Sequence, residues 1–124
     1  NFFDSIEVAP GVHANGEFTL GENIADHGGL QVSYQAFKKA TAAAPLKNEN
    51  GFTPEQRFFL SYANVWAGNI RPEEILKLTK IDPHSLGKWR VDGALPQIGA
   101  WYEAFNITEK DPMYLPVDKR VSIW

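Results

Sequence analysis

The chain has 124 residues, a length that fits one domain or a piece of a larger one. Its formal charge of −3 at pH 7 is too small to indicate nucleic acid or an anionic membrane as a partner. The absence of cysteine excludes disulfides, thiolate catalysis and cysteine-ligated zinc, and no apolar run approaches the roughly 18 to 20 residues of a membrane span. Because the chain does not begin with Met and shows no signal peptide, we expect it to derive from a longer one.

The first predicted element is a small β-hairpin within residues 6–18. Short extended runs at 6–8 and 12–14 lie on either side of Pro10-Gly11, and Asn15-Gly16 follows. Asn-Gly is a strong hairpin-turn signal because both residues tolerate positive φ. We therefore expect the turn at Asn15-Gly16.

A long amphipathic helix is predicted from Thr19 to about Ala42. Thr19 and Glu22 have the spacing of a capping box, in which each side chain satisfies a backbone N–H of the other residue. Gly28-Gly29 costs about 1 kcal/mol per glycine relative to alanine, which suggests that another group approaches closely there. One apolar face is formed by Leu20, Ile24, Leu30, Tyr34 and Phe37.

Three further helices are predicted after a polar loop at residues 45–52. The first begins at Thr53, with Pro54 in its first turn and Gln56 completing a capping box, and ends at Gly68-Asn69. Its two adjacent apolar faces favour a buried position. A short helix follows at 73–79 after Pro72, a loop at 82–87, and a last helix at 97–105 before a proline-rich tail. The fold class expected is mainly α with a small N-terminal hairpin.

Two carboxylates stand out on the first long helix. Glu22 and Asp26 are four residues apart and project from the same face, where like charges repel mildly. A metal bound to one carboxylate and an imidazole bound to the other would offset that repulsion. The spacing alone equally allows Glu22 to be a capping residue and Asp26 to be solvated near a helix start.

The residues around these carboxylates resemble those of the neprilysin and endothelin-converting-enzyme family of zinc endopeptidases, in its bacterial PepO type. The run Gly-Glu-Asn-Ile-Ala-Asp at 21–26, followed by Gly-Gly-Leu at 28–30, matches the third-ligand helix of that family. The resemblance implies that Glu22 completes a His-His-Glu zinc site. It also implies that Asp26 hydrogen-bonds a zinc-binding histidine and so raises its basicity.

A second constellation combines Asp82-Pro83-His84 with Arg90. By composition alone it is a surface loop with incidental charges. The family, however, has a recurring block matched here at 82–85 and 87–91. That resemblance implies that His84 donates a hydrogen bond to the oxyanion of peptide hydrolysis, that Asp82 orients His84, and that Arg90 binds a substrate backbone carbonyl.

A third segment contains Val65 and Trp66, which read plainly as buried residues at a helix end. The resemblance implies that both line the pocket for the side chain that follows the cleaved bond, which favours large hydrophobic residues there. His27 stands where relatives carry Asn, and His13 has no evident partner. We assign neither histidine a role as a ligand.

The chain lacks H-E-x-x-H, the motif that supplies two zinc-binding histidines and the general base of such enzymes. Residues 1–124 are therefore expected to be the C-terminal part of a thermolysin-like (gluzincin) catalytic domain. This part alone is expected to be inactive and free of zinc. The longer protein would be a zinc metalloendopeptidase located in the periplasm, in the cell envelope or outside a bacterium. Its partners would be peptides and the upstream remainder of the same chain. The alternative is a non-catalytic helical binding or assembly module that keeps the family fold.

Overall fold

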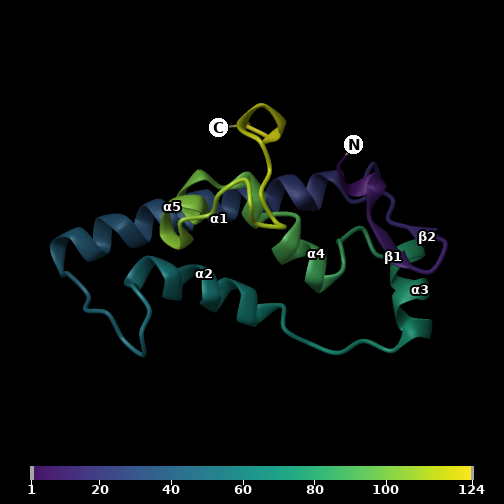
Figure 1. Cartoon of the computed structure of the whole chain (residues 1–124). Coiled ribbons are helices and arrows are strands. Elements are labelled where there is room, and N and C mark those ends of the chain that lie inside the picture. The colour runs from purple at the N-terminus through teal and green to yellow at the C-terminus, as the bar shows by residue number, and fades with distance from the viewer. Residues whose placement is uncertain (1, 124) are drawn as a thin grey trace.

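The fold was analysed in a computed structural model that describes residues 2–123 (Figure 1). It is mainly helical with one two-stranded antiparallel hairpin, which confirms the predicted fold class. Two long helices, α1 (Leu20–Ala43) and α2 (Pro54–Val65), run alongside each other. The shorter helices α4 (Gly87–Asp92) and α5 (Gly99–Phe105) lie between them, and the hairpin and α3 (Pro72–Ile81) lie at one end. Within residues 2–123, no helix combines the length and the apolar character needed to cross a membrane.

The hairpin consists of β1 (Glu7–Ala9) and β2 (Val12–His13). Its turn is Pro10-Gly11, where Gly11 adopts a φ of +72° that a residue with a Cβ rarely takes. The predicted turn at Asn15-Gly16 is therefore wrong. Asn15 instead opens the turn that leads into the next helix, because its side-chain oxygen accepts a hydrogen bond from the Phe18 N–H.

Helix α1 (Leu20–Ala43) begins after Thr19 as predicted, but the predicted capping box is wrong. The Thr19 hydroxyl donates to the Asn15 carbonyl and accepts from the Asn23 amide instead. Glu22 therefore plays no part in capping α1, and its carboxylate lies beside another part of the chain.

The glycine pair inside α1 is only partly explained by packing. Gly28 is buried, whereas Gly29 is exposed and a Cβ added there would meet no atom within 4 Å. The predicted close approach is therefore wrong at Gly29.

Helix α2 (Pro54–Val65) carries the predicted capping box. The Thr53 hydroxyl accepts from the Gln56 N–H at 3.1 Å, and the Gln56 side-chain oxygen accepts from the Thr53 N–H at 3.0 Å. The predicted burial of α2 on two faces is wrong, since Phe59 is buried but Val65 is 69% exposed.

The remaining helices are α3 (Pro72–Ile81), α4 (Gly87–Asp92) and α5 (Gly99–Phe105). Helix α3 is close to its predicted extent, while α4 was not predicted because six residues are too few to show a helical period. The last helix begins at Gly99 and not at residue 97, since a 3₁₀ turn at Leu95–Gln97 comes before it.

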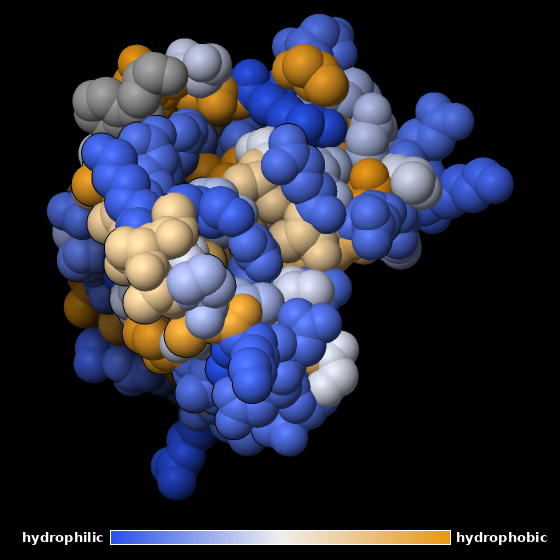
Figure 2. Space-filling model, turned by 90° about the vertical axis from the view of Figure 1, so that its left-hand side faces the viewer, coloured by the Kyte–Doolittle hydropathy of each residue, from blue (hydrophilic) through white to orange (hydrophobic). Residues whose placement is uncertain are grey.

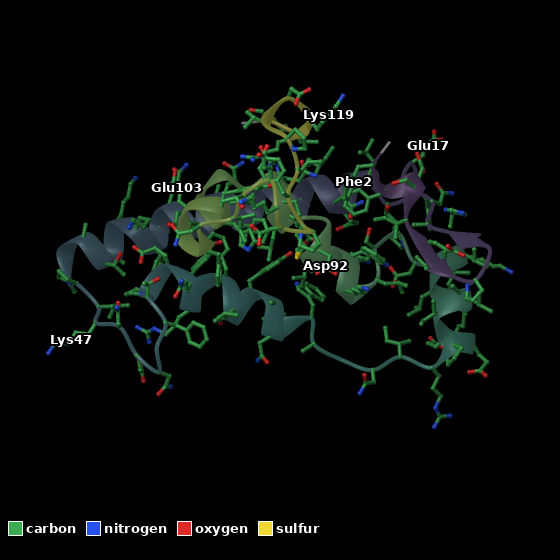
Figure 3. All side chains as sticks on the ribbon, viewed as in Figure 1. Phe2, Glu17, Lys47, Asp92, Glu103 and Lys119 are labelled. Atoms are coloured by element: carbon green, nitrogen blue, oxygen red, sulfur yellow. The ribbon has the colours of Figure 1, made fainter. Side chains whose placement is uncertain are left out.

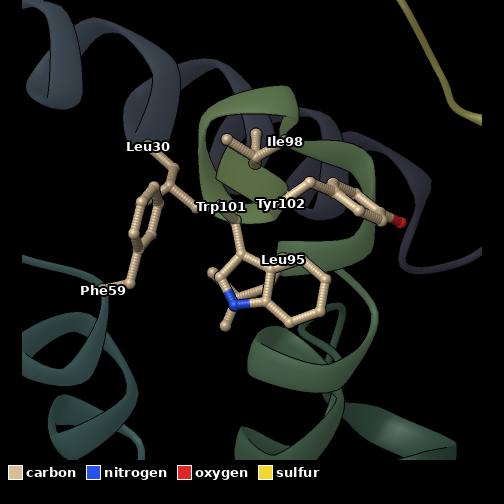
Figure 4. Packing of buried hydrophobic residues seen from close by; sticks show 6 residues of the cluster. All are labelled: Leu30, Phe59, Leu95, Ile98, Trp101 and Tyr102. Atoms are coloured by element: carbon tan, nitrogen blue, oxygen red, sulfur yellow. The ribbon is translucent and has the colours of Figure 1, made fainter. Parts of the chain in front are cut away.

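The core lies where α1, α2 and α5 meet (Figure 4). The Tyr102 hydroxyl donates to the Pro96 carbonyl at 2.8 Å and accepts from the Leu115 N–H at 3.0 Å. The Arg120 guanidinium lies 3.6 Å from the Tyr102 ring centre, which holds the C-terminal tail against the core. The buried cluster comprises Leu30, Phe59, Leu95, Ile98, Trp101 and Tyr102.

Hydrophobic side chains are partly exposed at the end of the molecule where α1 ends and α2 begins, among them Leu46 and Phe52. Figure 2 faces this end and shows apolar atoms interspersed among polar ones. Figure 3 shows Lys47 pointing away from the protein in the connecting loop, while other side chains crowd the space between α1, α4 and α5.

Removing the Thr53 hydroxyl tests the importance of the cap of α2. Thr53→Ala leaves the Gln56 N–H without its acceptor and should lower the free energy of unfolding by about 1 kcal/mol, measured by urea denaturation. Thr41→Ala is the matched control, because Thr41 bonds only carbonyls of its own helix. Equal stability of the two variants would contradict the capping role.

Candidate active site

The candidate site is held together by an ion pair between α1 and α4. Nε and Nη2 of Arg90 donate to the two carboxylate oxygens of Asp26 at 2.7 and 2.6 Å. Both side chains are 15% exposed, and their hydrogen bonds raise the pKa of Arg90 above its usual value. The bidentate geometry fixes the guanidinium plane relative to α1.

Helix α2 contacts the same arginine from a second side. The Arg90 guanidinium carbon lies 3.8 Å from the Trp66 ring centre, and the Tyr62 hydroxyl donates to the Arg90 carbonyl at 2.8 Å. A Cβ on Gly87 would come within 2.9 Å of the Trp66 carbonyl, so only glycine permits this approach of α4 to α2. Burial, and then the charge of Asp26, raise the pKa of Tyr62 to about 12.

A second group of side chains joins α1 to the loop before α4. His84 Nε2 lies 3.3 Å from a Glu22 carboxylate oxygen, and His84 Nδ1 lies 2.7 Å from Oδ1 of Asp82. The His84 backbone N–H donates to the same Asp82 oxygen at 2.9 Å. These two hydrogen bonds, that of the backbone first, lower the pKa of Asp82 and keep it an acceptor.

One further contact fixes this loop against α1. The Ser85 hydroxyl donates to the Asn23 side-chain oxygen at 2.8 Å, and the Asn23 amide in turn donates to Thr19 at the start of the helix. The loop that carries His84 is therefore attached to the first two turns of α1. These are the same turns that carry Glu22 and Asp26.

Trp66 and Val65 occupy different environments. Trp66 lines a groove of about 240 Å³ with Ile70, Ile75 and Trp89, whereas Val65 is 69% exposed at the end of α2. The charged residues Glu7 and Lys88 also line this groove.

A cavity of about 350 Å³ adjoins the Asp26–Arg90 pair. Among the groups that line it are the apolar side chains of Leu20, Ile24 and Trp89. His27 also lines this cavity and is 4% exposed, and burial lowers its pKa. His27 is therefore a buried structural residue that favours the neutral imidazole.

Glu22 is the residue of this site best suited to hold a metal ion, because a partly exposed carboxylate is a common zinc ligand. Among residues 2–123, no group of three or more His, Cys, Asp or Glu side chains could hold a metal ion. The Asp26 carboxylate can accept about four hydrogen bonds and accepts two from Arg90. It therefore retains capacity to accept one from an imidazole N–H. Glu22 can therefore supply the glutamate of a His-His-Glu zinc site, whose two histidines would have to come from elsewhere in the protein.

The structure brings together six of the seven residues singled out in the sequence, all except Val65. Sequence reasoning missed the Asp26–Arg90 pairing and the contacts of Tyr62 and Asn23. The first joins residues 64 apart, and Asn23 and Ser85 are 62 apart, so no local pattern indicates either pair. The six grouped residues are Glu22, Asp26, Trp66, Asp82, His84 and Arg90.

The chain resembles known peptidases in both sequence and structure. The Peptidase family M13 profile matches residues 1–121. The chain is 37% identical to human neprilysin and 40% identical to mouse membrane metallo-endopeptidase-like 1, covering 97% of this chain and 16% of each relative. Its structure superposes on the zinc metalloprotease Zmp1 of Mycobacterium tuberculosis in the open state with a TM-score of 0.86 and 37% identity, covering 90% of this chain and 17% of Zmp1. The chain therefore belongs to peptidase family M13 and corresponds to the C-terminal part of a neprilysin-like zinc metallopeptidase.

Proposed function

We propose that the full-length protein is a zinc-dependent endopeptidase that hydrolyses oligopeptides. In this proposal the chain supplies the glutamate ligand and the residues that contact the substrate. The observation that carries the proposal is the approach of His84 to within 3.3 Å of Glu22, because it sets an oxyanion donor beside a metal ligand. These residues come from segments far apart in the sequence, and a purely structural module has no need to bring them together.

Glu22 is proposed as the carboxylate ligand of the zinc ion. It lies on the first turn of α1 and takes no part in the helix cap, so its oxygens remain available. Bound zinc supplies an activated water molecule for attack on the peptide carbonyl. Asp26, one turn further along α1, is proposed to orient a zinc-binding histidine with the acceptor capacity that Arg90 leaves unused.

His84 is proposed to donate a hydrogen bond from Nε2 to the oxyanion that develops during hydrolysis. Asp82 accepts from the opposite ring nitrogen and from the His84 backbone, which fixes the position of the ring. With Nδ1–H bound to Asp82, the donation from Nε2 requires the imidazolium form, in which both ring nitrogens carry a proton. A donor held in place beforehand costs no reorganisation when the oxyanion forms.

Arg90 is proposed to bind a substrate carbonyl beyond the scissile bond. Its Nη1 group is not used by Asp26, and the adjacent carboxylate neutralises the guanidinium charge. The carboxylate of Asp26 weakens the attraction of Arg90 for a negatively charged group, so a neutral peptide carbonyl is a suitable partner for its Nη1 group. Trp66 is proposed to line the neighbouring pocket for a hydrophobic side chain, and the exposed Val65 is proposed to extend that pocket when the rest of the protein is present.

The upstream remainder of the protein is proposed to cover the cavity beside Asp26. Leu20 and Ile24 of α1 line this cavity together with Asp26, and an apolar surface of this kind is ordinarily covered by another part of the protein. A location outside the cytoplasm, in the cell envelope or secreted, is proposed because the relatives include a protein named as a membrane metallo-endopeptidase.

Replacing Glu22 tests the proposed ligand. In the full-length protein, Glu22→Ala should remove zinc and peptide hydrolysis together, since the metal loses one of three protein ligands. Zinc per chain is measured by metal analysis and activity with a fluorogenic peptide. Glu17→Ala, at an exposed glutamate before α1, is the control and should keep both. Retention of stoichiometric zinc by Glu22→Ala would refute the assignment.

The isolated 124-residue chain should hydrolyse no peptide and hold no stoichiometric zinc, because one carboxylate does not bind zinc tightly. Metal analysis after dialysis against zinc checks this expectation. One tightly bound zinc ion per chain would show that these residues form a complete site by themselves.

Replacing His84 tests the oxyanion role in the full-length protein. His84→Ala should lower kcat about 10²- to 10³-fold with a smaller change in KM, because the lost hydrogen bond forms in the transition state. His13→Ala, at an exposed histidine of β2, is the control and should leave both constants unchanged. An effect confined to KM would contradict the role of His84.

A further inference from the structure

Helix α2 contacts Arg90 at two points that serve different parts of the residue. Tyr62 and Trp66 are four residues apart, so their side chains leave the same face of the helix. Trp66 lies over the guanidinium, at 3.8 Å from ring centre to guanidinium carbon, while the Tyr62 hydroxyl reaches the backbone carbonyl at 2.8 Å. The two contacts together fix both ends of the arginine.

The Arg90 carbonyl, which accepts the hydrogen bond from Tyr62, lies in the last turn of α4. Helix α4 ends at Asp92, and the last carbonyl groups of a helix have no partner within it. The Tyr62 hydroxyl therefore fills an open acceptor and attaches the last turn of α4 to α2. Because burial raises the pKa of Tyr62 to about 12, the hydroxyl keeps its proton and stays a donor at ordinary pH.

We propose that Tyr62 is a positioning residue, whose hydroxyl holds the end of α4 so that Arg90 presents its unused Nη1 group to the substrate carbonyl. This inference rests on the proposed endopeptidase function and on the carbonyl-binding role of Arg90. Asp26 fixes the Nε and Nη2 edge of the guanidinium, and Trp66 fixes its face. Tyr62 adds a hydrogen bond to the Arg90 backbone itself, which the two side-chain contacts do not reach.

The experiment uses the full-length protein with Tyr62→Phe, which removes the hydroxyl and keeps the ring. Two peptides are compared, one of them unmodified and the other carrying a methylene in place of the carbonyl that Arg90 is proposed to bind. For the unmodified peptide, KM should rise about three- to tenfold with kcat nearly unchanged, the size of one neutral hydrogen bond. For the methylene peptide, Tyr62→Phe and wild type should have the same KM.

The matched control is Tyr34→Phe, at a tyrosine whose ring packs on Phe58 and Phe59 in the aromatic cluster of α1 and α2. It should leave KM unchanged for both peptides. A KM for Tyr62→Phe equal to that of Tyr34→Phe, or raised equally for both peptides, would overturn the positioning role. If wild type cleaves neither peptide, the proposed function itself fails. If it cleaves both with the same KM, the role of Arg90 fails and the inference with it.

Discussion

The ion pair between Asp26 and Arg90 is the contact on which the rest of the site depends. It joins α1 to α4 across 64 residues of sequence with two short hydrogen bonds, at 15% exposure of each side chain. A charge so little exposed is stable only with its partner present, so the two helices are fixed relative to each other. Glu22 lies one turn before Asp26, and the loop carrying His84 leads directly into α4. The approach of His84 to Glu22 therefore follows from the pairing of the helices.

Around this pair, the polar side chains are held by contacts with other residues of the chain, and none of these contacts involves a metal ion. Asp82 fixes the imidazole of His84, Ser85 bonds Asn23 on α1, and Trp66 covers the guanidinium of Arg90. Each of these groups has a partner within the chain, so they can hold their geometry without contributions from elsewhere in the protein. Such advance organisation is what a site for a developing charge requires.

The sequence predicted what depends on neighbouring residues and missed what depends on distant ones. The cap of α2 was predicted because Thr53 and Gln56 meet through local geometry alone. The capping box predicted at Thr19 is absent because the Thr19 hydroxyl bonds Asn15 and Asn23 instead. Glu22 lies beside His84. The family resemblance singled out the candidate residues and the contact of Asp82 with His84, but not the pairing of Asp26 with Arg90 or the approach of His84 to Glu22. A pair formed by two distant segments leaves no periodicity or spacing to detect.

The central claim is that Glu22 binds zinc while Asp26 keeps Arg90 in place. Anomalous diffraction at the zinc edge, from crystals of the full-length protein, tests this claim directly. The account predicts a metal about 2.0 to 2.2 Å from a carboxylate oxygen of Glu22, with the Asp26–Arg90 pair intact. A zinc ion bound elsewhere, or a metal bound by Glu22 with Arg90 released from Asp26, would contradict it.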